Sequence, residues 1–227
     1  MNENTIQCNI IARIHSDFGS KFAIPRQSGL VEELTAELVF EKSYRDAECL
    51  RGIEEFSHLW LLWVFSANAH QNWSPTVRPP RLGGNRRMGV FATRSPYRPN
   101  PIGLSSVRLL DVVHTADRGT VLRIGGADLM DGTPILDIKP YIATDCHENA
   151  AFGFTDTEEK RRCSVECDEA LLKKLPEEKR AALLGILAED PRPAYQDDPA
   201  RVYGFPFAGK EIRFRVRQGI LTVLEIN

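Results

Sequence analysis

Residues 105–142 read SSVRLLDVVHTADRGTVLRIGGADLMDGTPILDIKPYI, and the fold class follows from this stretch more than from any other. It contains three apolar runs, at residues 105–113, 120–124 and 135–142, separated by sequences rich in Gly, Asp and Thr. Short runs rich in Val and Ile between such turn sequences are typical of β-strands. No helical pattern lies between the runs, which favours an antiparallel sheet over alternating strands and helices.

The residues before this stretch extend the same pattern. Apolar and polar residues alternate at 6–14 and 34–40, residues 88–93 add a short run, and LWLLWVF at 59–65 is continuously apolar. Because 59–65 is too short for an ordinary helix, we interpret it as a strand buried on both faces, and we expect one short helix at 45–51. Many short strands joined by Pro- and Gly-rich turns predict a β-barrel or a β-sandwich.

The composition changes near residue 145, where the strand pattern ends. Asp168 can cap a helix, Pro176 can begin a second helix, and two apolar runs around Gln218–Gly219 predict a hairpin. We therefore expect a mainly β N-terminal domain at residues 1–145, a linker at 146–164 and a small α+β C-terminal domain at 165–227.

Length and composition place the chain among ordinary globular proteins. It has 227 residues, 29 Lys+Arg against 31 Asp+Glu, and 42% hydrophobic residues. These values exclude collagen-like, disordered and coiled-coil classes. Five scattered Cys residues fit a reducing compartment better than a disulfide-stapled secreted domain. Since the sequence shows neither a signal peptide nor an apolar stretch long enough to span a bilayer, we expect a cytoplasmic protein.

The charge is unevenly distributed along the chain. Residues 56–110 contain no Asp, Glu or Lys but seven Arg, namely Arg78, Arg81, Arg86, Arg87, Arg94, Arg98 and Arg108. Arg without Lys favours bidentate recognition of phosphate or carboxylate groups, and Phe91 and Tyr97 are available to stack on a base. Two interpretations stay open from charge alone: a surface for nucleic acid or another polyanion, or an Arg-rich face paired with the acidic remainder.

Common cofactor and metal motifs are missing from the sequence. There is no Walker A loop, no HExxH and no GxSxG, and the Gly pairs at 83–84 and 125–126 do not form a dinucleotide fingerprint. A Rossmann enzyme is therefore not expected. The Cys and His spacings lack a second matching half, so no metal site is predicted.

Two polar clusters are candidates for chemistry. The segment PRQ at 25–27 lies in a loop rich in Gly and Pro. Asp137, Lys139 and Tyr141 alternate along one predicted strand and therefore share a face. An acid, an amine and a phenol on one face could form an active-site wall, and the alternative is a surface salt bridge beside a Tyr.

Several long motifs resemble a known family: PRQSGL, LRGIEEFSHLWLLWVF, RPPRLGGNRRMGVFATRSPYRPNPIGLSSVRLLDV and DLMDGTPILDIKPYI. Over residues 6–145 the chain resembles the tRNA methyltransferases of the TrmO type, also called TsaA-like or YaeB-like, and DPRPAY at 190–195 resembles the start of that family's C-terminal domain. The resemblance implies an antiparallel β-barrel that binds S-adenosyl-L-methionine without a Rossmann fold and works as a homodimer. It also implies methylation of the exocyclic amine of threonylcarbamoyladenosine, next to the anticodon of threonine tRNAs.

The resemblance further implies the cofactor contacts, and the Arg-rich segment and the predicted strand face supply the other site candidates. Cofactor contacts are expected at Pro25, Arg26, Gln27, His58, Leu59, Arg94, Leu104, Met130, Asp131, Gly132 and Thr133. Contacts with tRNA are expected at Arg78, Arg81, Arg86, Arg87 and Arg98. The catalytic candidates are Asp137 as the base, with Lys139 and Tyr141 orienting the base or the threonyl carboxylate.

Two other function classes stay open at this point. One is a methyltransferase of the same fold that acts on another substrate. The other is a non-catalytic RNA-binding or cofactor-sensing module.

Overall fold

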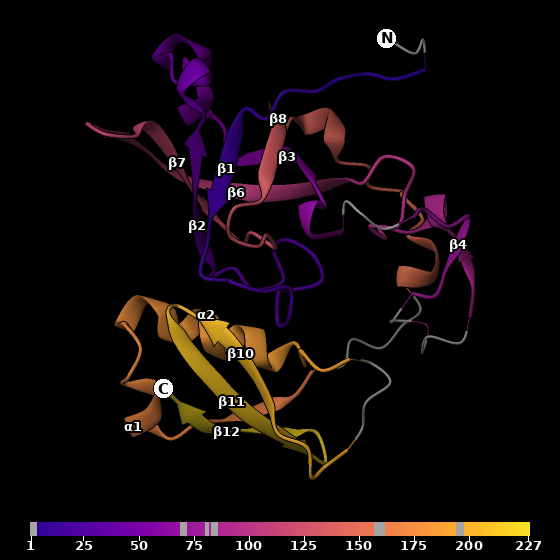
Figure 1. Cartoon of the computed structure of the whole chain (residues 1–227), viewed down its shortest axis with the longest axis vertical. Coiled ribbons are helices and arrows are strands. Elements are labelled where there is room, and N and C mark those ends of the chain that lie inside the picture. The colour runs from indigo at the N-terminus through magenta and orange to yellow at the C-terminus, as the bar shows by residue number, and fades with distance from the viewer. Residues whose placement is uncertain (1–3, 69–71, 80–81, 83–85, 157–161, 194–197) are drawn as a thin grey trace.

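The computed structural model describes residues 4–68, 72–79, 82, 86–156, 162–193 and 198–227. It is mainly β, and two bodies are visible in Figure 1: a sheet built from the first two-thirds of the chain and, below it, a smaller unit coloured orange to yellow. The expected order of a mainly β part followed by a small α+β part is confirmed.

The larger body is one antiparallel sheet of six strands. These strands are β1 (Ala12–His15), β2 (Thr35–Phe40), β3 (His58–Val64), β6 (Ile102–Thr115), β7 (Gly119–Gly125) and β8 (Pro134–Pro140). They pair in the order β1-β2-β7-β6-β3-β8, and β8 pairs again with β1, so the hydrogen bonding closes on itself. The enclosed core contains Ala12, Ile14, Leu38, Leu59, Leu61, Val107, Leu122, Ile124 and Ile135, among others.

Strand β3 differs from the sequence-based interpretation. Leu59 and Leu61 are fully buried in the core, but Trp60 and Leu62 on the other side of the strand are only partly buried. The expectation of a strand buried on both faces is therefore wrong for the single chain. The apolar composition alone could not show this, because it does not reveal whether another element covers the outer face.

The outer face of this sheet carries three rows of side chains across β6, β3 and β8. Paired residues on neighbouring antiparallel strands point to the same side. The register gives the rows Leu104–Leu62–Asp137, Ser106–Trp60–Lys139 and Arg108–His58–Tyr141, the last completed by the hydrogen bond from Tyr141 N to His58 O.

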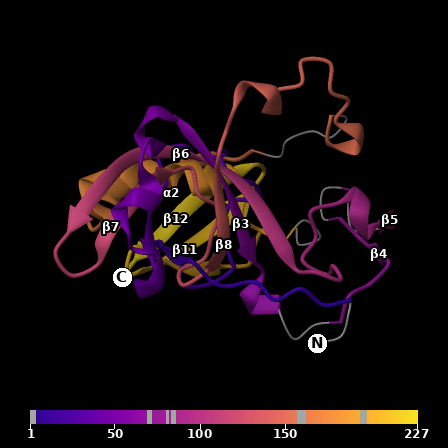
Figure 2. The same ribbon diagram turned by 90° about the horizontal axis from the view of Figure 1, so that it is seen from above.

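Short 3₁₀ turns and a two-stranded arm surround the sheet. The helix expected at 45–51 is a 3₁₀ turn at Ala47–Leu50, with further 3₁₀ turns before and after it at Lys42–Tyr44 and Ile53–Glu55. Further 3₁₀ turns lie at Ser66–Asn68, Val90–Ala92, Ala143–Asp145 and Gly153–Thr155. Strands β4 (Thr76–Val77) and β5 (Met88–Gly89) pair with each other and lie to the side of the main sheet (Figure 2). Only the first two residues of the run expected at 88–93 are a strand.

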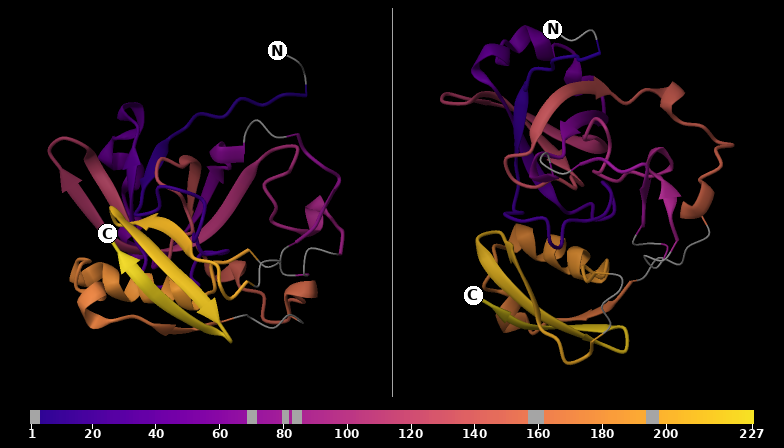
Figure 3. Two further views of the ribbon diagram at one scale, coloured as in Figure 1. Left: turned by 60° about the horizontal axis from the view of Figure 1, so that its bottom comes forward. Right: turned by 45° about the vertical axis from the view of Figure 1, so that its right-hand side comes forward.

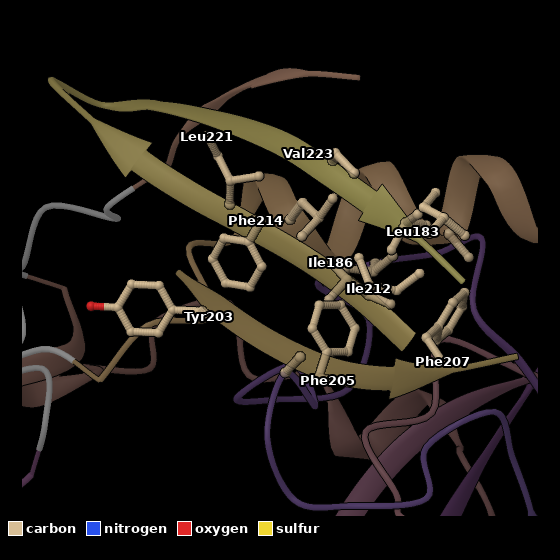
Figure 4. Close-up of a cluster of buried hydrophobic side chains, with 14 of the residues drawn as sticks. Leu183, Ile186, Tyr203, Phe205, Phe207, Ile212, Phe214, Leu221 and Val223 are labelled. Carbon is tan, nitrogen blue, oxygen red and sulfur yellow. The ribbon is translucent and has the colours of Figure 1, made fainter. Parts of the chain in front are cut away.

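The C-terminal body combines a sheet with helices. It contains β9 (Ser164–Glu166), α1 (Glu169–Leu172), α2 (Glu177–Ala188), β10 (Tyr203–Phe207), β11 (Lys210–Arg217) and β12 (Ile220–Ile226), with the strands in the order β10-β11-β12-β9. Asp168 caps α1 as predicted, accepting a hydrogen bond from Ala170 N at 2.7 Å. Figure 4 shows Leu183 and Ile186 of α2 beside the aromatic side chains of the sheet. The predicted hairpin is confirmed: Gln218 and Gly219 both have positive φ, at 50° and 77°, as a type I′ turn requires.

The loop between β1 and β2 joins the two bodies. Phe18, Ala23, Val31 and Leu34 come from this loop, yet they are buried in the C-terminal core. Lys179 Nζ of α2 lies 2.6 Å from the Asp17 carboxylate at the start of the loop. Figure 3 shows α2 directly below this part of the chain. The C-terminal body therefore fixes the path of residues 18–34, which include the PRQ segment.

Three further features bear on the type of protein. Across the described ranges, no helix combines the length and apolar character that crossing a membrane requires. All five Cys residues are free thiols. Among the described residues, no group of three or more His, Cys, Asp or Glu side chains could hold a metal ion.

Candidate functional site

A cavity of about 450 Å³, here called the first cavity, opens where several distant segments meet. They are the β1–β2 loop, the end of β3 with the turn after it, residues 93–98, the start of β6 and residues 128–133. Lys21 ties two of them together, since its Nζ donates to Ala67 O at 2.8 Å and Asn68 Oδ1 at 2.9 Å. This volume lies in the range of small-molecule sites.

A chain of hydrogen bonds forms one wall of the first cavity. Trp63 Nε1 donates to Ser105 Oγ at 3.0 Å, and Ser105 Oγ donates to Asp128 Oδ1 at 2.7 Å. Burial raises the pKa of Asp128, against the opposing effects of the Ser105 hydrogen bond and the positive charge of Arg94. The cavity thus contains a partly buried carboxylate held in a fixed orientation.

Gly103 makes room for the indole ring of Trp63. A Cβ atom at position 103 would lie 2.3 Å from the Trp63 ring, closer than any non-bonded carbon contact allows. The ring can therefore lie against β6 only because residue 103 has no side chain. Trp63 also packs edge-on to Phe65, with ring centroids 4.3 Å apart.

Polar side chains of the PRQ segment form another part of the cavity lining. Arg94 Nη1 donates to Gln27 Oε1, and Gln27 Nε2 donates to Arg26 O. Arg26, Gln27 and Arg94 line the first cavity. They also line a second cavity of about 1230 Å³ beside it. The Arg94–Gln27 pair therefore stands between two neighbouring cavities.

The DGT turn brings Met130 and Thr133 to the first cavity. Thr133 N and Thr133 Oγ1 both donate to Met130 O, at 3.1 and 2.7 Å. Gly132 has a φ of 75°, as the third position of a type II turn requires. Asp131 points out of the cavity and accepts a hydrogen bond from Ser16 N at 3.1 Å.

Most of the expected cofactor contacts meet at one place. The first cavity is lined by Pro25, Arg26, Gln27, Arg94, Leu104, Met130 and Thr133. His58, Leu59, Asp131 and Gly132 do not line it, so the first cavity gives no support to these four expected contacts, which stay predictions. Leu59 is fully buried in the sheet core, and His58 is exposed at the far end of β3, bonded to Ser57. Both residues lie at the start of β3, whereas Trp63 and Val64 at its other end line the cavity, so neither side chain reaches it.

The catalytic candidates share a face, as predicted, but that face is the outer side of the sheet. Asp137 Oδ2 lies 2.8 Å from Lys139 Nζ in an exposed ion pair. The Tyr141 ring lies 5.5 Å from the Trp60 ring. As far as the described residues define the two cavities, none of the three candidates lines either one. Within a single chain they do not form the expected active-site wall, because the strand alternation points them away from the sheet interior; their catalytic role stays a prediction.

The four described Arg residues among those expected to contact tRNA divide into three groups. Arg78 and Arg87 line the second cavity, while Arg86 is exposed and lines neither cavity. Arg98 Nη1 donates to Val90 O and Thr93 O at 3.1 and 2.6 Å, so this side chain holds the loop together. Arg81 lies outside the described residues.

Sequence reasoning missed several residues of the first cavity. Lys21, Trp63 and Asp128 line it, and Ser105 lies buried behind Trp63 and Asp128, but none of the four was among the expected contacts. Asp128 opens the DLMDGT motif, which is the one local signal that could have identified it.

Comparisons with known proteins agree with this arrangement. The model of the tRNA-methyltransferase O N-terminal domain matches residues 13–146, and that of the TrmO C-terminal domain matches residues 160–227. A tRNA (adenine(37)-N6)-methyltransferase of Escherichia coli (strain K12) is 42% identical over 222 residues, 94% of each chain. A protein of the same name from Eikenella corrodens is 47% identical over 169 residues, 74% of this chain and 95% of the relative.

The solved structures lead to the same family. The crystal structure of TrmO from Pseudomonas aeruginosa superposes with a TM-score of 0.77 at 32% identity, covering 98% of this chain and 99% of the other. Similarity therefore extends over both bodies of the fold and over the segments that meet at the first cavity. The chain belongs to the tRNA-methyltransferase O family.

Proposed function

We propose that this protein is an S-adenosylmethionine-dependent tRNA methyltransferase. It transfers a methyl group to the exocyclic amine of adenine 37, in the form of threonylcarbamoyladenosine, next to the anticodon of threonine tRNAs. The observation that carries the proposal is the first cavity, where seven of the expected cofactor contacts meet in a chain of the tRNA-methyltransferase O family.

The residues of the first cavity fit the cofactor. S-adenosylmethionine carries a sulfonium and an ammonium group, a carboxylate and an adenine ring. Asp128 would hold the cationic part, because it is the carboxylate of the cavity lining. Arg26 and Arg94 would hold the carboxylate, and the Trp63 ring offers an apolar face to the adenine. When bound, the cofactor supplies an electrophilic methyl group.

The task of the protein is then to position the acceptor and to accept its proton. Reacting atoms must come within about 3–3.5 Å of each other in line. The Arg94–Gln27 pair, between the two cavities, would orient the acceptor at the cofactor. Asp137 remains our candidate for the base, with Lys139 and Tyr141 orienting it or the threonyl carboxylate.

A homodimer would bring Asp137 and the cofactor site together. In the outer rows, Asp137 lies two strands from Leu104, about 10 Å away. Leu104 itself lines the first cavity, and both Leu104 and its neighbour Ile102 are more than 40% exposed, at 46% and 42%. We propose that the outer face of β6, β3 and β8 is the dimer interface, and that it presents Asp137 of one subunit to the first cavity of the other.

Mixing two inactive variants tests the shared site. Asp137→Asn and Arg94→Ala are each expected to be inactive, and their mixture is expected to regain activity because one site of each mixed dimer is intact. No recovery in a mixture in which subunit exchange has been shown to form mixed dimers would contradict a shared site.

The domain division and the location complete the proposal. Residues 1–145 form the catalytic domain, on an antiparallel β-barrel scaffold, 146–164 the linker and 165–227 the C-terminal domain; the family matches at 13–146 and 160–227 support this division. The contacts of residues 18–34 give the C-terminal domain a structural role in holding the PRQ segment. We expect the protein in the cytoplasm, where its tRNA substrate is found.

The proposed function is tested by methyl incorporation into defined tRNAs. Threonine tRNA carrying threonylcarbamoyladenosine should accept label from S-adenosylmethionine, and the same tRNA lacking the threonylcarbamoyl group should accept much less. Equal labelling of both would contradict the proposed substrate, and labelling of neither would contradict the methyltransferase activity.

A further inference from the structure

The second cavity, of about 1230 Å³, lies directly beside the first. Its lining comes from residues 74–79, 87–97 and 152–155, together with the PRQ segment. Figures 1 and 3 show the turn at Gly153–Thr155 next to the β4 arm. The two cavities share Arg26, Gln27, Thr93, Arg94 and Pro96. Two molecules bound in the two cavities would therefore meet at this common wall.

The charge of the second cavity is positive. Its lining includes the cations Arg26, Arg78, Arg87 and Arg94, and no Asp or Glu is found among the described residues that line it. Arg87 is oriented by Thr76, since its Nη1 donates to Thr76 Oγ1 at 3.1 Å. Arg guanidinium groups bind phosphates and carboxylates bidentately. The second cavity is therefore suited to an anionic ligand.

Exposed aromatic rings surround the same cavity. Phe91 and Phe152 are 75% and 61% exposed, unusual values for Phe, and Tyr97 is 39% exposed. The guanidinium of Arg98 already covers the Phe91 ring at 5.6 Å. Rings beside a basic groove are typical of proteins that stack the bases of single-stranded RNA.

Phe152 is held in place by a tight turn. Thr155 Oγ1 donates to Phe152 O at 2.7 Å, and Thr155 N donates to the same oxygen at 3.3 Å. Gly153, with a φ of 58°, allows the turn to form. This segment lies between the regions that the family models match, which end at residue 146 and resume at residue 160. Residues 152–155 of the linker therefore form part of the wall of the second cavity.

We propose that the second cavity holds the acceptor nucleotide of the RNA, and that Phe152 of the linker stacks on its base. Arg78 and Arg87 bind the anionic groups of that nucleotide. The proposal rests on the proposed function and adds where the substrate binds. The acceptor amine then meets the first cavity at the wall that contains Arg94 and Gln27.

Fluorescence of a stem–loop RNA carrying 2-aminopurine in place of the acceptor adenine tests the stacking directly. The fluorescence should fall when wild-type protein binds, because stacking on an aromatic ring quenches 2-aminopurine. Phe152→Ala should abolish this quenching and raise the KM for tRNA by about 5-fold to 100-fold, the range for the loss of one base–aromatic stack. The Phe152→Ala variant should keep the wild-type affinity for S-adenosylhomocysteine and the wild-type melting temperature.

Two control variants separate stacking from a general effect on the linker. Phe152→Tyr keeps an aromatic ring and should behave like the wild type. Ile142→Ala removes another exposed apolar side chain, 47% exposed and outside both cavity linings, and should change nothing. The proposal is overturned if Phe152→Ala quenches and methylates like the wild type, or if Ile142→Ala has the same effect as Phe152→Ala.

The same assay distinguishes failure of this inference from failure of the proposed function. If the wild type methylates no tRNA, the proposed function fails, and the quenching experiment still tests the second cavity. Quenching that depends on Phe152 would then support a nucleotide site without methyl transfer. If the RNA binds without quenching, the proposed nucleotide site in the second cavity is wrong.

Discussion

Replacing Asp128 with Asn removes one charge from the first cavity and keeps its shape. The Asn Oδ1 can still accept the hydrogen bond that Ser105 Oγ donates to Asp128 at 2.7 Å, so the link to Trp63 stays. Burial raises the pKa of Asp128, which means that the native state holds the charged carboxylate at a cost. We therefore expect Asp128→Asn to melt at the same temperature as the wild type or higher near neutral pH.

The sign of the pH dependence follows from the raised pKa. For an acid whose pKa is higher in the folded state, protonation favours the native state, and that stabilisation is lost as the pH rises from the unfolded-state pKa through the folded-state pKa. The stability advantage of Asp128→Asn should therefore be present near neutral pH and disappear below the ordinary carboxyl range. Thermal melts of both proteins across this pH range measure it.

Asp128→Asn should weaken cofactor binding, although it should leave the stability of the protein unchanged or raise it. A charge-assisted hydrogen bond contributes about 2 kcal/mol, so Asp128→Asn should weaken S-adenosylmethionine binding roughly 30-fold in calorimetry. Wild-type affinity should fall as Asp128 is protonated at lower pH, and the affinity of the variant should not. Asp131→Asn is the matched control, because this nearby carboxylate lies outside the cavity and should leave affinity unchanged. Wild-type affinity in Asp128→Asn, or an equal loss in Asp131→Asn, would refute the assignment.

Three further substitutions test other parts of the site. Gly103→Ala should displace the Trp63 ring, because the added methyl group overpacks the site and lowers the free energy of unfolding by about 1–3 kcal/mol. It should also shift the Trp fluorescence emission and weaken S-adenosylhomocysteine binding. An unchanged emission spectrum and affinity would contradict the close contact. Arg87→Ala should lower the slope of log K for tRNA against log salt by up to about 0.9, and Arg86→Ala should lower it less. If the slope of Arg87→Ala equals that of the wild type, Arg87 does not contact the RNA phosphates. Asp137→Asn should lower the single-turnover methylation rate by about 10²–10⁴-fold with both affinities intact, whereas a wild-type rate would make the outer ion pair purely structural.

Local sequence patterns predicted those parts of the fold that local chemistry controls. The hairpin at Gln218–Gly219 and the cap at Asp168 follow from turn and capping preferences over a few residues, and both are present. The helix expected at 45–51 is a 3₁₀ turn at Ala47–Leu50, and the next 3₁₀ turn begins after Gly52, which has a φ of 84°. Arg51, with a ψ of 122°, and Gly52, with a positive φ, cannot continue a helix, and the sequence pattern did not indicate this.

Other parts depend on contacts between distant residues, which a local pattern does not contain. Period-two alternation showed that Asp137 and Lys139 share a face, but it could not show that this face is the outer one. Leu59 belongs to a motif that the family resemblance placed at the cofactor, yet its side chain lies in the core. Asp128 acquires its burial, and with it its raised pKa, from the surrounding segments, so its role was visible only after folding.

The central claim is that the first cavity holds the cofactor between Asp128 and Arg94. Crystals grown with S-adenosylhomocysteine test it most directly. We predict ligand density in the first cavity, with its amino group at the Asp128 carboxylate and its carboxylate at Arg94. Density in the second cavity instead, or ordered ligand that contacts neither Asp128 nor Arg94, would contradict the account.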